Sequence, residues 1–183
     1  VNQLPEEEKR QIKAYLNVDM IGSPNYANFI YDGDGSDFGL QGPPGSGAIE
    51  RLLRTYFQLR NAPSEGTEID FRSDYAQFFD DGIAFGGLFT GAEDIKSVEQ
   101  AQRYGGTAGE AYDPCYHSAC DNLGNISTEA LELHGDALAF ATSWLSLSTK
   151  MVDDEIAAAA EPSIGTLRVQ KVQEKSRWGH WIR

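Results

Sequence analysis

Hydrophobic and polar positions follow two spacings along the first 150 residues, and together they predict strands separated by helices. Apolar residues dominate residues 14–21, 28–31 and 83–89, and each run closes at a turn rich in glycine. Short apolar runs bounded by such turns are typical of buried strands. A further strand is expected near residues 67–69.

Helical spacing marks the segments between these strands. The apolar residues of one segment recur at i, i+3, i+4, i+7 and i+8, so one face should cover a sheet: Ile49, Leu52, Leu53, Tyr56 and Phe57. A second, long helix is expected over residues 128–147, with a buried stripe of Leu133, Ala137, Phe140, Ala141, Trp144 and Leu145.

Three shorter helices complete the prediction. Pro5 and the acidic residues after it suit a helix start. Asp74 and Gln77 have the spacing of a capping pair for the second. The third covers residues 97–104.

This order of elements predicts an α/β fold, a mixed β-sheet with helices on both faces. We expect residues 1–149 to form the domain and residues 150–183 to be a poorly ordered tail. Ligands in such sheets bind at the carboxyl ends of strands. Asp19, Thr90 and the loop of residues 113–122 follow or adjoin predicted strands, so we expect them near a site.

Charge excludes two classes of partner. Residues 1–160 hold 10 Lys and Arg against 26 Asp and Glu, a net charge of −16, whereas residues 161–183 have a net charge of +3. An acidic surface repels phosphate backbones and anionic lipid, so we expect no binding to nucleic acid or membranes. No apolar run is long enough to suggest a membrane span.

One histidine lies between the only two cysteines, in the sequence DPCYHSACDN of residues 113–122. A disulfide between Cys115 and Cys120 would hold His117 rigidly, as a metal ligand requires, although a lone loop histidine is more often a surface residue. Zinc binding by the cysteines themselves would need more ligands at short spacing. The cysteine pair and the glycosylation pattern at Asn125 favour a secretory setting.

Other acidic and basic residues leave alternatives open. Asp19 at a strand end is a metal ligand, a general base or a structural hydrogen-bond acceptor. Arg72, between Asp70 and Asp74, has the ordinary interpretation of a surface salt bridge. The acidic turn of residues 32–37 lacks the glycine and glutamate of an EF-hand, so we interpret it as an ordinary loop and disfavour a calcium-dependent module. We assign no role to His134 or His180.

Several motifs in order resemble the M28 family of secreted dizinc aminopeptidases, closest to its Streptomyces-type and fungal leucine-type members. They are LNVDMIGSPN at residues 16–25, RSDY at 72–75, GGLFTGAE at 86–93, the segment 100–109, and DPCYHSACDN. The resemblance covers about residues 14–147. It implies a zinc-exopeptidase-like fold with its N-terminal part missing from this chain.

The resemblance also implies site residues and a cofactor of two zinc ions. Asp19 and His117 match one ligand of each ion, and Tyr116 matches a tyrosine that hydrogen-bonds the tetrahedral intermediate. Arg72, Met20 and Phe89 match substrate-binding positions, and Cys115 and Cys120 match the family's disulfide. Such a site activates water and polarises the scissile carbonyl.

Two departures from the family pattern matter. The remaining ligands, a His, a bridging Asp and a Glu-Glu pair, precede the DM motif in the family and are not in this chain. Phe71 stands where relatives carry glycine, so we expect its ring to crowd the pocket.

We therefore predict the C-terminal half of a secreted, or vacuolar, monomeric aminopeptidase that removes N-terminal apolar residues from peptides. We expect the isolated 183 residues to be inactive. The alternative is a non-catalytic binding or receptor ectodomain of the same fold.

Overall fold

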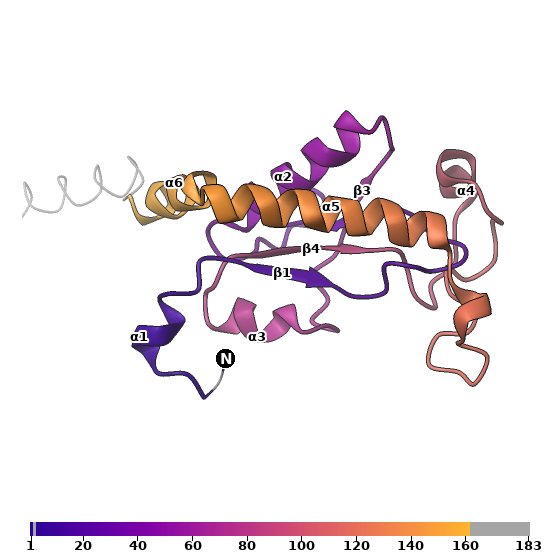
Figure 1. Cartoon of the computed structure of the whole chain (residues 1–183), viewed down its shortest axis with the longest axis horizontal. Helices are drawn as coiled ribbons and strands as arrows, with labels where there is room; N and C mark the ends of the chain where they lie inside the picture. Colours follow the sequence, from indigo (N-terminus) through magenta and orange to yellow (C-terminus); the bar gives the residue numbers. More distant parts are fainter. Residues whose placement is uncertain (2, 162–183) are drawn as a thin grey trace, which may run out of the picture.

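A computed structural model describes residue 1 and residues 3–161, and its centre is a four-stranded sheet (Figure 1). The strands are β1 (Tyr15–Val18), β2 (Phe29–Tyr31), β3 (Glu65–Thr67) and β4 (Phe85–Phe89), in the spatial order β1-β4-β2-β3. β1 runs parallel to β4 and β2 parallel to β3, whereas β2 and β4 are antiparallel. The predicted mixed sheet is confirmed, although β3 begins two residues before the expected strand.

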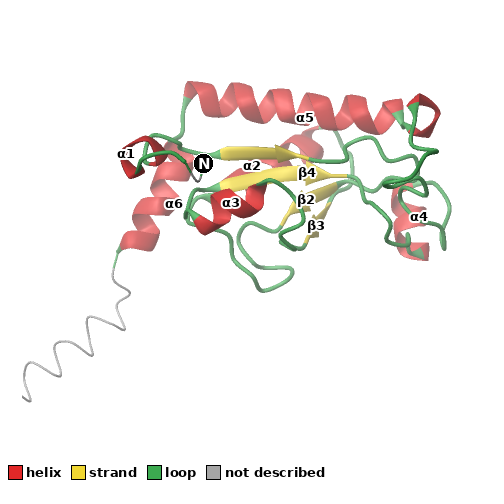
Figure 2. Ribbon diagram, turned by 90° about the horizontal axis from the view of Figure 1, so that it is seen from below, coloured by secondary structure: helices red, strands yellow, loops and turns green. Residues whose placement is uncertain are grey.

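Helices cover both faces of the sheet, as predicted (Figure 2). They are α1 (Glu6–Lys9), α2 (Ser46–Leu59), α3 (Tyr75–Asp80), α4 (Val98–Tyr104), α5 (Thr128–Leu147) and α6 (Lys150–Ala160), with a 3-10 turn η1 (Leu123–Asn125). α2 and α5 pack on one face and α3 on the other. Within the described residues, no helix combines the length and apolar character needed to cross a membrane.

Strand alternation places buried side chains on both sides of the sheet, because neighbouring side chains point to opposite faces. Ile30 and Leu88 pack with the apolar face of α2. Tyr31 and Phe85 point the other way and pack against Tyr75 of α3. The stacked rings of Tyr75 and Phe85, with centroids 4.8 Å apart, fix α3 beneath the strands.

The buried stripe of α5 is rotated from the predicted one. Ala130, His134, Ala137 and Ala141 are buried, whereas Trp144 is 52% exposed. Of the predicted stripe, Ala137 and Ala141 are buried, Leu133, Phe140 and Leu145 are partly buried against the same core, and Trp144 is not. Asp74 does begin α3, but its side chain makes no capping hydrogen bond, so the predicted capping pair is wrong.

Residues 150–160 belong to the fold, which corrects the expectation of a poorly ordered tail over residues 150–183 for this part of it. They form α6, whose Val152 is fully buried in the core shared with α2. The α6 side chain of Glu155 accepts hydrogen bonds from the amides of Gly45 and Gly47, at 2.9 and 3.1 Å, where α2 begins. Residues 162–183 lie outside the described residues.

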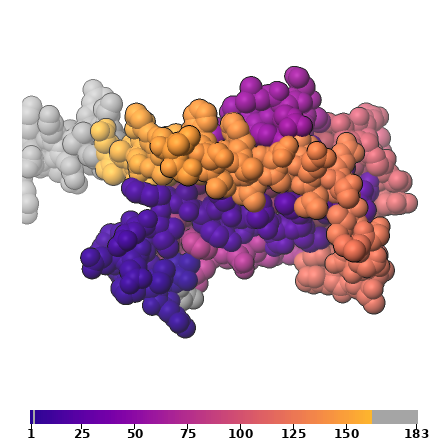
Figure 3. Space-filling view, viewed as in Figure 1, coloured from indigo at the N-terminus to yellow at the C-terminus, as the bar shows by residue number. Residues whose placement is uncertain are grey.

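The N-terminal segment packs beside α6 (Figure 3). Lys13 and Asp153 form an ion pair of 2.9 Å across this contact. The segment before β1 is therefore tied to the last helix of the described chain.

Candidate active site

One cavity of about 350 Å³ collects every side chain predicted to bind metal or substrate or to act in catalysis. Its lining includes Asp19, Met20, Arg72, Phe89, Tyr116 and His117. Asp19 directly follows β1, and Phe89 ends the adjacent parallel strand β4. The sheet and the loop of residues 113–122 therefore bring Asp19 and His117 to one space, as the sequence predicted. Their chemical roles stay predictions.

A chain of hydrogen bonds orients the Asp19 carboxylate. The hydroxyl of Ser73 donates to Asp19 Oδ2 at 2.7 Å. The amide of the buried Asn17 in turn donates to the Ser73 hydroxyl at 3.0 Å. Asp19 is exposed toward the cavity while its orientation is set from the sheet, an arrangement common for metal-binding carboxylates.

His117 is held by a cross-linked loop. Cys115 and Cys120 form a disulfide, and His117 adopts a left-handed backbone with φ of 51°. Its imidazole stacks on the Tyr116 ring, with centroids 4.0 Å apart. The loop geometry thus restricts where the imidazole can point.

Buried Asp113 anchors the start of this loop. Its carboxylate accepts from the Cys115 amide at 2.9 Å and from the Asn125 side chain at 2.8 Å. The nitrogen of Asn125 is the atom to which a glycan would attach, so glycosylation there would remove one of the two N–H donors of the group that holds Asp113.

The main partner of Arg72 is Glu93, rather than Asp70 or Asp74, which are its neighbours in sequence. Its guanidinium donates to Glu93 at 2.7 Å and reaches the Tyr116 hydroxyl at 3.4 Å, whereas its nearest approach to Asp70 is 4.0 Å. The hydrogen bond to Glu93 raises the pKa of Arg72. The pKa of Glu93 is lowered by a hydrogen bond from its own backbone amide and by Arg72. Arg72 thus stays charged beside Tyr116.

Phe71 does not crowd the cavity, which corrects the prediction. Its ring packs edge-on against Phe79 of α3, with centroids 4.9 Å apart, and it is not among the cavity-lining residues. Its φ of 62° lies in the region that glycine adopts without strain. The backbone conformation thus turns the side chain toward α3.

Further carboxylates in the cavity were not predicted. Glu68, Asp70, Asp94 and Asp121 also line it, against the single guanidinium of Arg72. Asp121 lies within the motif of residues 113–122, and Asp94 directly follows the motif of residues 86–93. Their position in or beside these motifs is the sequence feature that could have predicted them as cavity residues. The lining is strongly acidic, so it attracts metal ions and protonated amines.

Thr90 has a structural position at the end of β4. Its buried hydroxyl accepts from the Ser23 amide at 3.1 Å and contacts the Met20 carbonyl. These bonds tie the segment after β1 to β4. Thr90 therefore positions Asp19 and Met20 but does not line the cavity.

His134 lies away from the cavity, buried in α5, with its Nε2 2.9 Å from the Asn28 side-chain oxygen. Burial lowers its pKa to about 4. His134 is therefore neutral near pH 7 and has a structural environment.

The donor types around Asp19 and His117 fit zinc, which binds carboxylate oxygen and imidazole nitrogen. Two ligands, however, are too few to complete a zinc site. Among the described residues, the one group of three or more potential ligands close enough to share an ion is Asp32, Asp37 and Glu50, none of which lines the cavity. The cavity therefore holds, in Asp19 and His117, two side chains of the types that bind zinc.

Comparisons with known proteins place the chain among peptidases. A family model described as "Peptidase family M28" matches residues 1–142. The chain is 70% identical over 182 residues to an "Aminopeptidase" of Pseudomonas aeruginosa, covering 98% of this chain and 34% of that protein. It is 52% identical over 143 residues to a "Probable leucine aminopeptidase 2" of Aspergillus fumigatus, covering 78% of this chain and 28% of that protein.

The chain thus spans about a third of the length of these relatives. A solved structure described as a zinc aminopeptidase from Bacillus subtilis aligns with a TM-score of 0.55 and 21% identity, over 77% of this chain and 30% of that one. This structural likeness shows a shared fold.

Proposed function

Because the chain belongs to peptidase family M28, we propose that it contributes one part of the active site of a zinc aminopeptidase. The observation that carries the proposal is the meeting of Asp19 and His117 in one acidic cavity, beside Arg72 and Tyr116. The similarity to proteins named aminopeptidases supports removal of N-terminal residues from peptides.

We assign Asp19 and His117 as one ligand for each of two zinc ions. Zinc, when bound, activates a water molecule and polarises the scissile carbonyl. Ser73 holds the Asp19 carboxylate, and the disulfide loop holds His117. The remaining ligands are proposed to lie outside these 183 residues, so we expect the isolated chain to be inactive and to bind zinc weakly.

Tyr116 is positioned to stabilise negative charge. Since Arg72 donates to the Tyr116 oxygen, the hydroxyl proton of Tyr116 is directed elsewhere and is available to an oxyanion in the cavity. The acidic lining favours the free amino end of a peptide. Met20 and Phe89 supply apolar surface, and we assign them to an apolar N-terminal side chain.

The disulfide supports a location in an oxidising compartment, and we propose a secreted protein. A monomer acting on peptides is the simplest form of this proposal.

Hydrolysis of leucine p-nitroanilide tests the assignment. A form of the protein long enough to supply the remaining ligands should hydrolyse it, and His117→Ala and Asp19→Asn should each abolish most activity and lower the zinc content. Asp80→Asn, an exposed carboxylate outside the cavity, is the control and should keep both. Full activity in His117→Ala, or none in the unaltered protein with zinc, would contradict the proposal and favour a binding module.

A further inference from the structure

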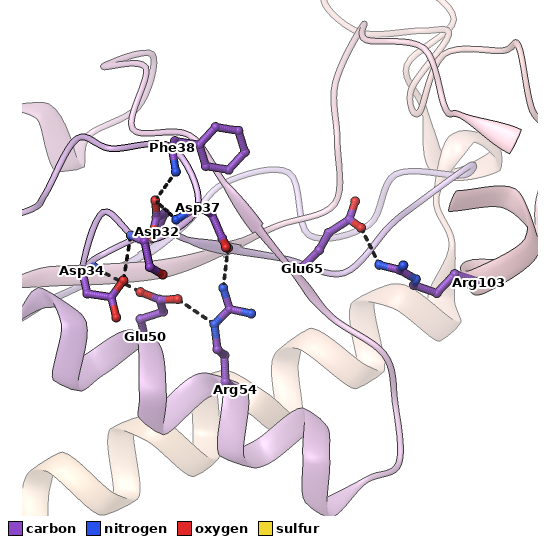
Figure 4. A network of polar contacts seen from close by, with 9 residues as sticks. Asp32, Asp34, Asp37, Phe38, Glu50, Arg54, Glu65 and Arg103 are labelled. Carbon is purple, nitrogen blue, oxygen red and sulfur yellow. Dashed lines mark hydrogen bonds and ion pairs between the residues drawn. The ribbon is translucent and has the colours of Figure 1, made fainter. Parts of the chain in front are cut away.

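A second cluster of carboxylates lies in the loop after β2 and on the facing side of α2 (Figure 4). Asp32 is fully buried, and its Oδ2 accepts from the backbone amides of Asp37 and Phe38, at 3.0 and 2.8 Å. These bonds wrap residues 33–38 around the Asp32 side chain. None of the residues in this cluster lines the active-site cavity.

The other carboxylate oxygen of Asp32 has no hydrogen-bond partner. Oδ1 is buried and unpaired within the described residues. A charged oxygen removed from water without a compensating partner is strongly unfavourable, and such groups in folded proteins are paired or bind metal. The Asp32 carboxylate lies close to the Glu50 carboxylate in Figure 4.

Three carboxylates converge at this point. Asp32, Asp37 and Glu50 each present an oxygen within 4.8 Å of the others, and Glu50 is only 2% exposed. Arg54 pairs with Glu50 at 2.6 Å and with Asp37 at 2.8 Å. One guanidinium against three carboxylates leaves two negative charges, which a divalent cation would balance.

The sheet leaves room for this arrangement at Gly66 of β3. A Cβ added to Gly66 would stand 2.2 Å from the Asp37 carboxylate and 3.3 Å from the Arg54 guanidinium. The absence of a side chain at this position therefore allows Asp37 and Arg54 to approach the strand.

We propose that Asp32, Asp37 and Glu50 bind a structural Ca²⁺ ion. All the donors are oxygens, which suit a hard cation, whereas zinc would favour nitrogen or sulfur. Ca²⁺ accepts irregular loop geometry, whereas Mg²⁺ requires a regular octahedron and retains water. The ion links the loop after β2 to α2, and its effect is on stability. The ligand set includes a helical residue, so it differs from the EF-hand pattern rejected on sequence.

Thermal unfolding with added Ca²⁺ tests this site. The sample is the protein at its full expressed length, from which calcium has been removed on a chelating resin, and the zinc concentration is held constant. Ca²⁺ should raise the melting temperature by several degrees in a saturable manner, and Mg²⁺ at the same concentration should raise it much less. Equilibrium dialysis should show one Ca²⁺ ion bound per protein molecule at this cluster.

Variants separate the site from general screening of negative charge. Asp37→Asn leaves the two buried carboxylates in place and should lose the Ca²⁺ response, as should Asp32→Asn if it folds. Asp80→Asn removes an equal charge elsewhere and should keep the response. No Ca²⁺ response in the unaltered protein, or the same response in Asp37→Asn, would overturn the site. Neither result affects the zinc assignment, which hydrolysis measures.

Discussion

The hydroxyl of Ser73 donates to the carboxylate of Asp19 at 2.7 Å, linking the segment before α3 to the end of β1. The same hydroxyl accepts from the buried amide of Asn17 at 3.0 Å. A carboxylate that faces a cavity on a strand end would otherwise rotate among several rotamers. This chain of bonds selects one orientation before any ligand arrives.

Ser73→Ala should therefore weaken zinc binding. Loss of such a supporting hydrogen bond lowers metal affinity by about 10–100-fold in proteins, and we expect that range here. Competition against a chromophoric chelator, in a form of the protein that holds all ligands, measures the affinity. Ser146→Ala on the exposed side of α5 is the matched control. Unchanged affinity in Ser73→Ala would show that the bond has no orienting role.

Tyr116→Phe should reduce turnover more than substrate binding. Without the hydroxyl, the cavity loses a donor for the developing oxyanion, and removal of one such donor lowers kcat by roughly 100-fold to 1,000-fold. Steady-state kinetics with leucine p-nitroanilide separates kcat from KM. Tyr15→Phe removes a hydroxyl from a ring stacked on Phe78, outside the cavity, and should leave kcat unchanged. A rise in KM alone would instead assign Tyr116 to substrate binding.

The sequence predicted the sheet, most helices and the residues that meet in the cavity, because apolar spacing and short motifs are local signals. It did not predict partners distant in sequence. The contact of Arg72 with Glu93 depends on how the loop after β4 returns to the segment before α3. The direction of Phe71 depends on a left-handed backbone that periodicity does not show.

The same limit explains α6. Most of its apolar residues are alanines, and the larger ones are limited to Met151, Val152 and Ile156, so local pattern alone indicates little burial. The helix is nevertheless part of the core, because Val152 meets α2 and because Glu155 lies against the start of α2, where backbone amides lack helical partners. Only the contact of α6 with α2 in the folded protein shows the structural roles of Val152 and Glu155.

Val152→Ala and Glu155→Gln should each destabilise the fold. Removing two buried methyl groups at Val152 should lower the free energy of unfolding by about 2 kcal/mol. Weakening the negative charge at the start of α2 should lower it by about 1 kcal/mol. Urea unfolding measures both. Asp154 is exposed and, among the residues that the structure describes, forms an ion pair with Lys150, so Asp154→Asn should change it by less than about 0.5 kcal/mol. Equal stability of all three variants would remove α6 from the core.

Acid should destabilise the protein through His134 before the carboxylates respond. Burial lowers the pKa of His134 from 6.5 to about 4, so the unfolded chain binds a proton in this range that the folded chain does not. Stability is therefore complete above pH 6.5 and is lost as the pH falls toward 4, by about 2 kcal/mol at about pH 5. Urea unfolding at about pH 7 and about pH 5 measures the loss. His134→Gln keeps a donor toward Asn28 and removes the titration, so its stability should fall much less over the same interval. An equal loss in both proteins would place the acid sensitivity elsewhere.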